Sequence, residues 1–289
     1  MNIRMENKMD GIVLVDKKAD WTSRDVVNKL TRRLGTKKIG HTGTLDPFAT
    51  GLLVITIGKG TKAGQFLEAM DKTYIASLKL GKSTDTLDFT GNVTSEKEVK
   101  LPLDKIEVEN VLKSFLGEIE QIPPKFSAIK INGVRAYEMA RNGEEVTIPS
   151  RKVTIHELEL IDIKDDEISF KVHCSKGTYV RTLGEDIASK LGYPGHLTSL
   201  RRIQVGDFKI EEALDVNEIE EKNIVPITSA LTNYKKYICS PKETEMVKNG
   251  VKLKINDTVD LFMVSQEGEA LAIYSLNKDG YYHTVRGLF

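Results

Sequence analysis

The sequence predicts an α+β protein with a mixed, largely antiparallel central sheet flanked by helices and a small β-rich unit at the C-terminal end. Two observations lead to this class. Segments with apolar residues at helical spacing are interspersed among segments in which apolar and polar residues alternate. Several alternating segments are separated only by short turns, which favours antiparallel hairpins. After about residue 231 the sequence changes to short β-like runs, so we expect one domain over residues 1–231 and another over residues 232–289.

The first seventy residues are expected to supply two buried strands and two helices. Residues 11–17 (GIVLVDK) and 52–58 (LLVITIG) are short apolar runs of strand length. Ser23 is the expected N-cap of a helix that ends at Gly35, since apolar residues between them recur three and four positions apart. A second helix is expected over residues 61–70.

The middle of the chain continues in the same way. Residues 107–116 and 178–191 have helical spacing and are each followed by a glycine. Turn residues occur at Asp165-Asp166, and Asn132-Gly133 is a hairpin-type turn. Strands are expected where apolar and polar residues alternate, over residues 73–81, 126–133, 153–163, 168–174 and 200–208.

The composition is that of a soluble globular protein: 289 residues, of which 40% are hydrophobic and 29% charged. No run approaches the roughly 18 apolar residues of a membrane span, and the N-terminus lacks the apolar core of a secretory signal. The two cysteines, Cys174 and Cys239, lie far apart in the sequence, which indicates reduced thiols. We therefore expect a cytoplasmic protein with no membrane segment.

The charges balance overall, with 42 basic and 42 acidic residues, but they are not evenly distributed. Residues 17–38 hold eight basic and two acidic side chains, a local charge of +6. A run of this kind is usually a solvated helix face, although its position directly before an unusual loop favours contact with phosphates. The candidates for such contacts are Arg32, Arg33, Lys37 and Lys38, and later in the chain Arg201 and Arg202.

The unusual loop is residues 40–51 (GHTGTLDPFATG), where three glycines, three threonines and a proline surround one carboxylate, Asp46. An isolated Asp-Pro pair is usually turn chemistry, but a turn needs far fewer constrained residues than this loop has. Loops that hold functional side chains are often stiffened in this way. Simple glycoside hydrolysis generally uses two carboxylates. An enzyme that breaks a glycosidic bond and rejoins the sugar to the same base needs no incoming water, and one acid suffices.

One competing pattern is a dinucleotide fingerprint. Residues 58–63 (GKGTKA) match G-x-G-x-x-A after a strand, and Asp85 follows at a distance that suits a ribose contact. Against this, residues 73–81 are amphipathic, whereas a strand of a dinucleotide-binding sheet is apolar on both faces. Absence of NAD binding in calorimetry would exclude this alternative.

Other chemistries lack their motifs. The sequence has no Walker-type phosphate loop, no zinc-type pairing of its five histidines and no G-x-S-x-G elbow. Neither a metal nor a cofactor is therefore expected.

Seven segments of the chain, in order, resemble the TruB family, the synthases that make pseudouridine at uridine-55 in the T arm of tRNA. The segments are the loop over residues 40–51 and six others: GIVLVDK…TS (11–23), DKTYIASLKLG (71–81), STDTLDFTG (83–91), PPKFSAIKINGVRAYEMAR (123–141), CSKGTYVRTLGEDI (174–187) and GHLTSLRR (195–202). They cover most of residues 11–210, and together they are specific to the family. The resemblance implies a pseudouridine synthase fold, and the residues after Leu231 resemble the family's PUA-like RNA-binding domain.

The resemblance also implies roles for individual residues. Asp46 would be the catalytic aspartate, and Arg181 would pair with it and keep it ionised. Tyr74 would stack on the flipped uracil, since a base must leave its stack before the sugar carbon is reachable. The residues expected around the substrate are His41, Tyr179, Leu200 and Lys17.

Taken singly, Tyr74 is equally well explained as a core tyrosine and Arg181 as a surface arginine, but their agreement with the other segments favours the functional interpretation. One departure lies after the first strand, where the family has Lys-Pro and a glycine and this chain has Lys17-Lys18-Ala19-Asp20-Trp21. The expected function is isomerisation of uridine-55 in tRNA by a cofactor-independent monomer. The alternative is a non-catalytic protein that binds or remodels tRNA, which has no need of a lone acid in its pocket.

Overall fold

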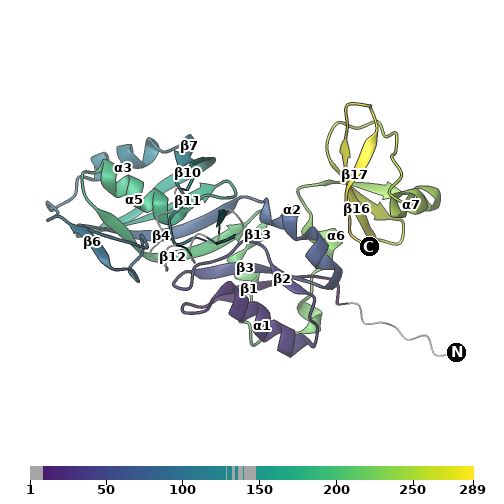
Figure 1. Cartoon of the computed structure of the whole chain (residues 1–289), viewed down its shortest axis with the longest axis horizontal. Helices are drawn as coiled ribbons and strands as arrows, with labels where there is room; N and C mark the ends of the chain where they lie inside the picture. Colours follow the sequence, from purple (N-terminus) through teal and green to yellow (C-terminus); the bar gives the residue numbers. More distant parts are fainter. Residues whose placement is uncertain (1–8, 128, 132–133, 136–138, 140–147) are drawn as a thin grey trace. The chain divides into compact units, whose positions relative to one another are not determined.

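The computed structural model describes residues 9–127, 129–131, 134–135, 139 and 148–289. Contacts between Cα atoms divide the chain into two compact units. The first comprises Met1–Pro47, Gly51–Met70 and Gly206–Phe289, and the second comprises Phe48–Thr50 and Asp71–Val205. Figure 1 shows the elements, coloured along the chain. The expected domain boundary at residue 231 stays a prediction.

The first unit contains two buried antiparallel strands. β1 (Gly11–Lys17) pairs with β3 (Thr50–Ile57), with Gly11 opposite Ile57 at one end. Short β2 (Ile39–His41) also pairs with β3. Almost all side chains of β1 and β3 are buried, as expected from their unbroken apolar runs.

Helix α1 (Ser23–Leu34) has Thr22 as its N-cap. The Thr22 hydroxyl accepts from the Asp25 N–H, and the Asp25 carboxylate accepts from the Thr22 N–H, which completes a capping box. The expectation that Ser23 is the N-cap is therefore wrong by one residue. Gly35 ends the helix as expected, in the left-handed conformation with φ of 65°.

The stretch that resembled a dinucleotide fingerprint forms a 3-10 helix, η1 (Gly58–Ala63), followed by the short α2 (Gly64–Glu68). Its Lys59 N–H donates to the carboxylate of Asp10 at 2.7 Å. The Lys59 N–H, which a bound phosphate would need as a donor, is thus already bonded to a carboxylate of the chain itself. In addition, the short α2 takes the place of the long helix that a dinucleotide-binding motif has.

The residues after the second unit return to β1. β-Bridges join Leu214 to Val15 and Val225 to Ile12. The short elements of this stretch are β13 (Phe208–Lys209), η2 (Ile210–Glu212), η3 (Glu221–Asn223) and α6 (Ile227–Ala230).

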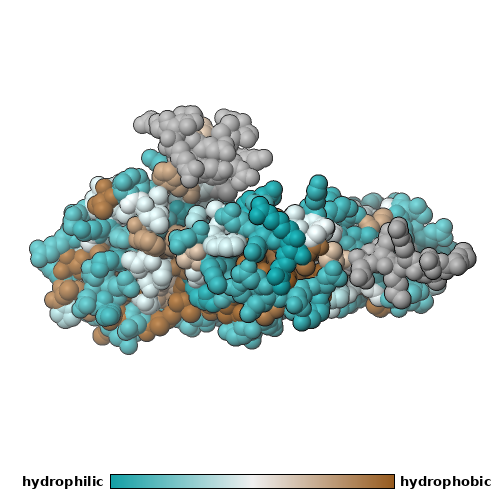
Figure 2. Space-filling model, turned by 90° about the horizontal axis from the view of Figure 1, so that it is seen from below, coloured by the Kyte–Doolittle hydropathy of each residue, from teal (hydrophilic) through white to brown (hydrophobic). Residues whose placement is uncertain are grey.

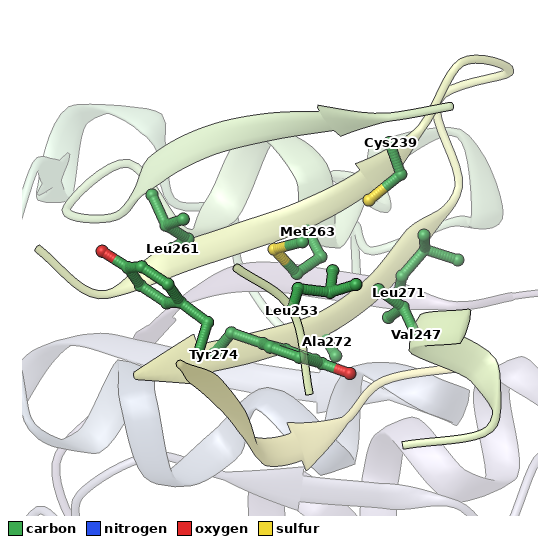
Figure 3. Packing of buried hydrophobic residues seen from close by; sticks show 9 residues of the cluster. Cys239, Val247, Leu253, Leu261, Met263, Leu271, Ala272 and Tyr274 are labelled. Carbon is green, nitrogen blue, oxygen red and sulfur yellow. The ribbon is translucent and has the colours of Figure 1, made fainter. Parts of the chain in front are cut away.

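The C-terminal residues form a separate four-stranded sheet in the order β14-β15-β16-β17, in which β14 and β15 are parallel and the other pairs antiparallel. Its elements are β14 (Lys235–Cys239), α7 (Pro241–Lys248), β15 (Leu261–Ser265), β16 (Ala270–Leu276) and β17 (Tyr282–Gly287). Figure 3 shows the buried cluster of this sheet, in which Met263 and Leu253 lie between the strands and α7. The expected β-rich unit is confirmed.

The second unit is an antiparallel sheet in the order β12-β4-β11-β10-β7. The strands are β4 (Lys72–Leu80), β7 (Gly117–Gln121), β10 (Arg151–Lys164), β11 (Glu167–Cys174) and β12 (Gly195–Val205). Two small ribbons accompany it: β5 (Lys82–Thr84) with β6 (Val93–Glu96), and β8 (Lys130–Ile131) with β9 (Val134–Arg135).

Two helices pack on the second unit's sheet (Figure 1): α3 (Lys105–Lys113) contacts β10, and α5 (Val180–Lys190) contacts β12 and β4. Glycine permits the close approach of α5, because a Cβ atom added to Gly195 would lie 2.5 Å from the Ala188 Cβ. The α5 helix therefore rests directly on the strands.

The predicted class is confirmed: the protein is α+β, with hairpin-paired strands, helices against them and a distinct C-terminal sheet. The hairpin around Asp165-Asp166 forms, with Asp165 in the left-handed conformation. The predicted turn at Asn132-Gly133 lies outside the described residues. None of the described helices is long and apolar enough to cross a membrane. On the face drawn in Figure 2, hydrophobic residues occur in small groups among hydrophilic ones.

Candidate active site

Asp46 lies in the loop between β2 and β3, and the residue before it is bonded to helix α1. The Leu45 N–H donates to the Ser23 hydroxyl at 2.9 Å, and that hydroxyl lies 3.3 Å from the Leu45 carbonyl, to which it donates. Ser23 is buried and begins α1, so its side chain ties the loop to the helix start. Asp46 itself is half-buried.

The residue after Asp46 is held from the other side. The Pro47 carbonyl accepts from the Asp20 N–H at 2.9 Å and from the Lys17 ammonium at 3.2 Å. The same ammonium donates to the carbonyls of Lys18 and Trp21. Lys17 is 1% exposed. Lys17 is expected near the substrate. In the structure its ammonium group donates to backbone carbonyls of two neighbouring loops.

The altered loop after β1 keeps a conformation that favours glycine. Asp20 has φ of 66°, which aspartate tolerates better than most residues. In the Asp46 loop, Gly43 and Gly51 have φ of 83° and 104°. In this chain Asp20 therefore adopts the left-handed conformation that glycine adopts most readily.

The basic run is largely on the surface of the first unit. Arg32, Lys37 and Lys38 are exposed. Arg33 is also exposed, but its Nε donates to the Ile219 carbonyl and is committed to that bond. His41 is half-buried at the end of β2, opposite Ile55.

Strand pairing in the second unit gathers three predicted residues on neighbouring strands. Tyr74 on β4 lies opposite Arg202 on β12, and Leu200 lies opposite Ala76. All these side chains are buried, and alternation along β4 puts Tyr74 and Ala76 on the same face. Arg202 is only 1% exposed. Such burial does not suit its expected role as a surface phosphate contact.

Arg201 lies on the opposite face of the sheet from its neighbours in sequence. It pairs with Ile75, and its Nη1 lies 3.4 Å from the Thr50 hydroxyl, to which it donates. Arg201 is half-buried, so part of its side chain remains accessible.

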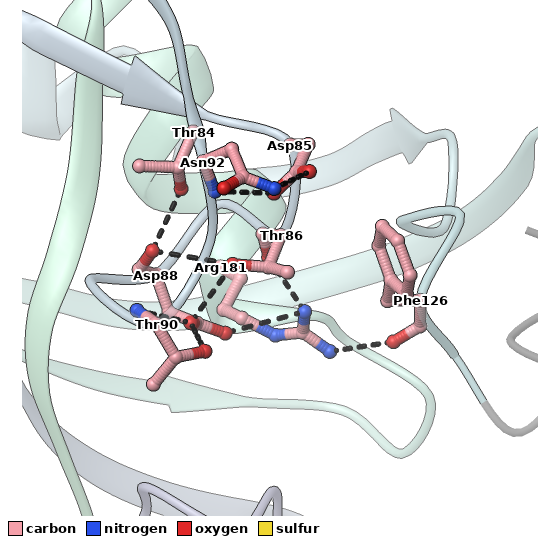
Figure 4. Close-up of polar contacts among 8 residues, drawn as sticks. All are labelled: Thr84, Asp85, Thr86, Asp88, Thr90, Asn92, Phe126 and Arg181. Carbon is pink, nitrogen blue, oxygen red and sulfur yellow. Dashed lines mark hydrogen bonds and ion pairs between the residues drawn. The ribbon is translucent and has the colours of Figure 1, made fainter. Parts of the chain in front are cut away.

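Arg181, in the first turn of α5, is buried, with 3% of its side chain exposed. Its guanidinium donates to the carbonyls of Thr86 at 2.6 Å and Phe126 at 3.0 Å. It also forms an ion pair with Asp88, with 3.5 Å between Nη1 and Oδ2 (Figure 4). The surface position considered for Arg181 is therefore wrong. A buried guanidinium with fixed partners is suited to hold an anion in place.

Asp88 was not singled out from the sequence. Its carboxylate accepts from the Thr86 hydroxyl at 2.9 Å and from the Thr90 N–H at 3.0 Å, and its carbonyl accepts from the Thr84 hydroxyl (Figure 4). The repeated threonines and aspartates of STDTLDFTG (83–91) are the signal that could have indicated this network.

Tyr179 precedes α5 and is positioned by Gln121 of β7. The Tyr179 N–H donates to Gln121 Oε1 at 3.0 Å, and Gln121 Nε2 donates back to the Tyr179 carbonyl at 3.3 Å. The Arg151 guanidinium lies 4.5 Å from the centre of the Tyr179 ring. Gln121 is a second positioning residue that the sequence did not indicate.

Burial raises the pKa of three titratable groups in the second unit. Burial, and secondarily the Glu185 carboxylate, raise the pKa of Asp186 to about 6. Burial also raises the pKa of the Glu185 carboxyl and raises the pKa of the Cys174 thiol to about 11. Within the described part of the chain, no group of three or more His, Cys, Asp or Glu side chains could hold a metal ion.

Comparison with known proteins adds to this geometry. A sequence model described as the N-terminal domain of TruB family pseudouridylate synthase matches residues 31–180. A second, described as the tRNA pseudouridylate synthase B C-terminal domain, matches residues 181–238. These matches, with the α+β fold and the single-carboxylate loop, define the class as the pseudouridine synthases, enzymes that isomerise uridine. The chain belongs to the TruB family of that class.

Relatives extend over almost the whole chain. The chain is 41% identical over 285 residues to tRNA pseudouridine synthase B of Geobacillus thermodenitrificans, covering 92% of this chain and 94% of the relative. It is 44% identical over 283 residues to tRNA pseudouridine synthase B of Bacillus cereus, covering 92% of each.

Solved structures show the same fold. A chain of a Cbf5-Nop10-Gar1 complex has a TM-score of 0.72 and 25% identity, covering 95% of this chain and 80% of that one. A chain of an H/ACA RNP bound to a substrate RNA containing 2'-deoxyuridine has a TM-score of 0.74 at 21% identity, covering 100% of this chain and 88% of that one.

Proposed function

We propose that this enzyme converts uridine-55 in the T loop of tRNA to pseudouridine without a cofactor. The observation that carries the proposal is the fixed position of Asp46, whose two neighbours are bonded to Ser23 on one side and to Lys17 and Asp20 on the other. The relatives named tRNA pseudouridine synthase B support tRNA as the substrate. The loop resemblance supports uridine-55.

The proposed reaction is an isomerisation in which nothing is added or lost overall. The uridine leaves the stack of the T loop, and its N1–C1′ bond breaks. The detached uracil turns, its C5 bonds to C1′, and the C5 proton is removed while N1 ends protonated. Asp46 acts at the sugar, either by attacking C1′ or by taking the 2′ proton, and both alternatives need the carboxylate at a fixed distance from the ribose.

The surrounding residues have supporting roles in this proposal. Tyr74 stacks on the flipped uracil, and Arg181 stabilises the Asp46 carboxylate. The ion pair with Asp88 holds the Arg181 guanidinium in one orientation for this task. The remaining residues proposed to contact the flipped nucleotide are His41, Tyr179 and Leu200.

The tRNA backbone is proposed to contact exposed cations. Arg32, Lys37 and Lys38 are exposed on the first unit, and the guanidinium of Arg201 is partly accessible on the second. Cations of this kind position an RNA without reading its sequence. We also expect the enzyme to act as a monomer in the cytoplasm.

The test is incubation of the purified chain with an unmodified tRNA transcript, with pseudouridine mapped by carbodiimide treatment and primer extension. We expect one stop, at position 55, and none in a matched transcript with cytidine there. A T-arm stem-loop alone should also react. Tight binding of the transcript with no pseudouridine at any position would contradict the proposal and favour the non-catalytic tRNA-remodelling alternative.

A further inference from the structure

Phe89 exposes an aromatic ring at a fixed position in the second unit. The residue is 55% exposed, although its neighbour Asp88 is buried. Among the described residues with large exposed apolar side chains, the only other phenylalanine is Phe289, whose ring faces the ammonium of Lys62. Single exposed apolar residues are common, so the surroundings of Phe89 have to decide whether its exposure has a function.

The backbone around Phe89 is held on both sides. The Phe89 N–H donates to the Leu197 carbonyl at 2.9 Å, and the Leu197 N–H donates to the Leu87 carbonyl at 3.1 Å. The following residue, Thr90, donates its N–H to the Asp88 carboxylate (Figure 4). The ring is therefore presented from a segment attached to β12, which lowers the entropy lost when a partner binds it.

The ring of Phe89 also packs against a residue of the loop that contains Asp46. Phe48 contacts Phe89 edge to face, with ring centres 5.8 Å apart and planes at 88°. Phe48 is buried, whereas more than half of Phe89 remains in solvent. Along the chain, Phe48 is two residues from Asp46, and Phe89 directly follows the ion-pair partner of Arg181.

A cation of β12, Arg201, is bonded to the segment that carries Phe48. Thr50, two residues after Phe48, accepts from the guanidinium of Arg201. Proteins bind unstacked nucleotides by combining aromatic rings on which bases stack with cationic side chains that contact the backbone.

On the basis of the proposed function, we propose that Phe89 binds the substrate RNA by stacking on one nucleotide of the loop that contains the target uridine, other than that uridine itself. The T loop must open for its uridine to leave the stack, so a neighbouring base loses a stacking partner. The Phe89 ring replaces that partner. Phe89 thus adds to RNA affinity without taking part in bond breaking.

The test is single-turnover conversion of a T-arm stem-loop at increasing enzyme concentration. Loss of one aromatic stacking contact corresponds to about a 5- to 150-fold rise in the half-saturating concentration. We expect this rise for Phe89→Ala and Phe89→Leu, with a maximal rate within about 3-fold of wild type and recovery of affinity in Phe89→Trp. The matched control is Ile106→Ala, an exposed apolar residue on α3, which should bind as wild type.

The stacked nucleotide is identified by abasic substitutions in the stem-loop. At one position the abasic RNA should bind Phe89→Ala and the wild type equally, because the contact is already absent. Equal half-saturation for wild type, Phe89→Ala and Phe89→Leu on intact RNA contradicts the inference. If Phe89→Leu and Phe89→Trp had the same half-saturating concentration, this would contradict stacking and favour a simple apolar contact. A wild-type chain that makes no pseudouridine contradicts the proposed function instead.

Discussion

Asp46 lies between two residues whose backbone groups are bonded to buried side chains. Ser23 binds both polar backbone groups of Leu45, and the Lys17 ammonium binds the Pro47 carbonyl. Buried backbone groups need such partners, because leaving one unpaired costs roughly 1–3 kcal/mol. The same bonds that stabilise the loop therefore also limit where the Asp46 carboxylate can be.

We predict that Ser23→Ala lowers both stability and rate. The Leu45 N–H loses its acceptor, which should cost about 1–3 kcal/mol in the free energy of unfolding. A small displacement of Asp46 should lower the single-turnover rate by about 10- to 100-fold. Urea unfolding and pseudouridine formation at saturating enzyme measure the two effects.

The matched control is the neighbouring Thr22→Ala. It removes the N-cap of α1 and should cost about 1 kcal/mol of stability, but it leaves the bonds to Leu45 in place. Its rate should equal that of wild type. If both variants turned over at the wild-type rate, the loop would not depend on Ser23.

At the scale of elements, α5 can lie close to the sheet because Gly195 has no Cβ atom. A Cβ on Gly195 would lie 2.5 Å from the Ala188 Cβ and 3.2 Å from the Lys79 carbonyl oxygen, neither of which can rotate away. We predict that Gly195→Ala lowers the free energy of unfolding by about 1–3 kcal/mol through overpacking.

The opposite effect on the free energy of unfolding is expected when alanine replaces a helical glycine with open surroundings. Apart from the adjacent residues and the backbone of its own helix, no atom lies within 4 Å of a Cβ added to Gly64 in α2. Gly64→Ala should therefore raise the free energy of unfolding by about 0.5–1 kcal/mol, because alanine loses less entropy in a helix. Urea unfolding of the two variants measures both, and a stability loss in Gly64→Ala or none in Gly195→Ala would contradict this account of the packing.

A second element-scale prediction concerns pH. Burial raises the pKa of Asp186 on α5 to about 6 from its usual 3.8. Between these values the folded chain keeps a proton that the unfolded chain has lost, so stability falls as pH rises from about 4 and levels off above the folded pKa. Asp186→Asn removes this penalty and should gain stability relative to wild type on going from pH 4 to pH 8. The gain should be on the order of 1 kcal/mol, reduced by partial solvent exposure. An equal stability difference at both pH values would refute the assignment.

At the scale of the whole molecule, the net charge is zero, but basic residues are concentrated in residues 17–38. We predict that tRNA binding weakens steeply with salt. Each phosphate contact should contribute up to about −0.9 to the slope of log K against log salt concentration. Replacing Arg32, Lys37 and Lys38 by glutamine should flatten that slope while sparing the single-turnover rate at saturating enzyme.

A control with the same change in charge tests whether position matters. Lys100, Lys113 and Lys164 are three of the exposed lysines of the second unit and lie outside the proposed site. Their triple replacement by glutamine should leave the slope nearly unchanged. Equal slopes for the two triple variants would mean that the run over residues 17–38 is only a solvated helix face.

The sequence allows local elements and the constrained loop around Asp46 to be predicted, because both follow from short-range patterns. Alternation around Asp165-Asp166 indicated the hairpin of β10 and β11, and glycines marked the ends of helices. The bond between Ser23 and Leu45 and the ion pair between Asp88 and Arg181 were not predicted. These contacts join residues far apart in sequence, and no periodicity encodes such a pairing.

The burial of two predicted site residues also does not follow from the local sequence. The roles of Lys17 near the substrate and of Arg202 at RNA phosphates stay predictions, but their burial is unexpected because long cationic side chains are usually exposed. Both are 1% exposed here. Burial of a charge depends on distant partners, so the sequence around each residue carried no sign of it.

The central claim is that Asp46 is the group that acts on the ribose, and Asp46→Asn tests it most directly. The amide keeps the size of the side chain and the bonds to Leu45 and Pro47, and it removes the carboxylate. In single-turnover assays on unmodified tRNA at saturating enzyme, we predict a rate loss of several powers of ten with tRNA affinity within a few fold of wild type. Pseudouridine formation within tenfold of the wild-type rate would contradict the account and remove Asp46 from the mechanism.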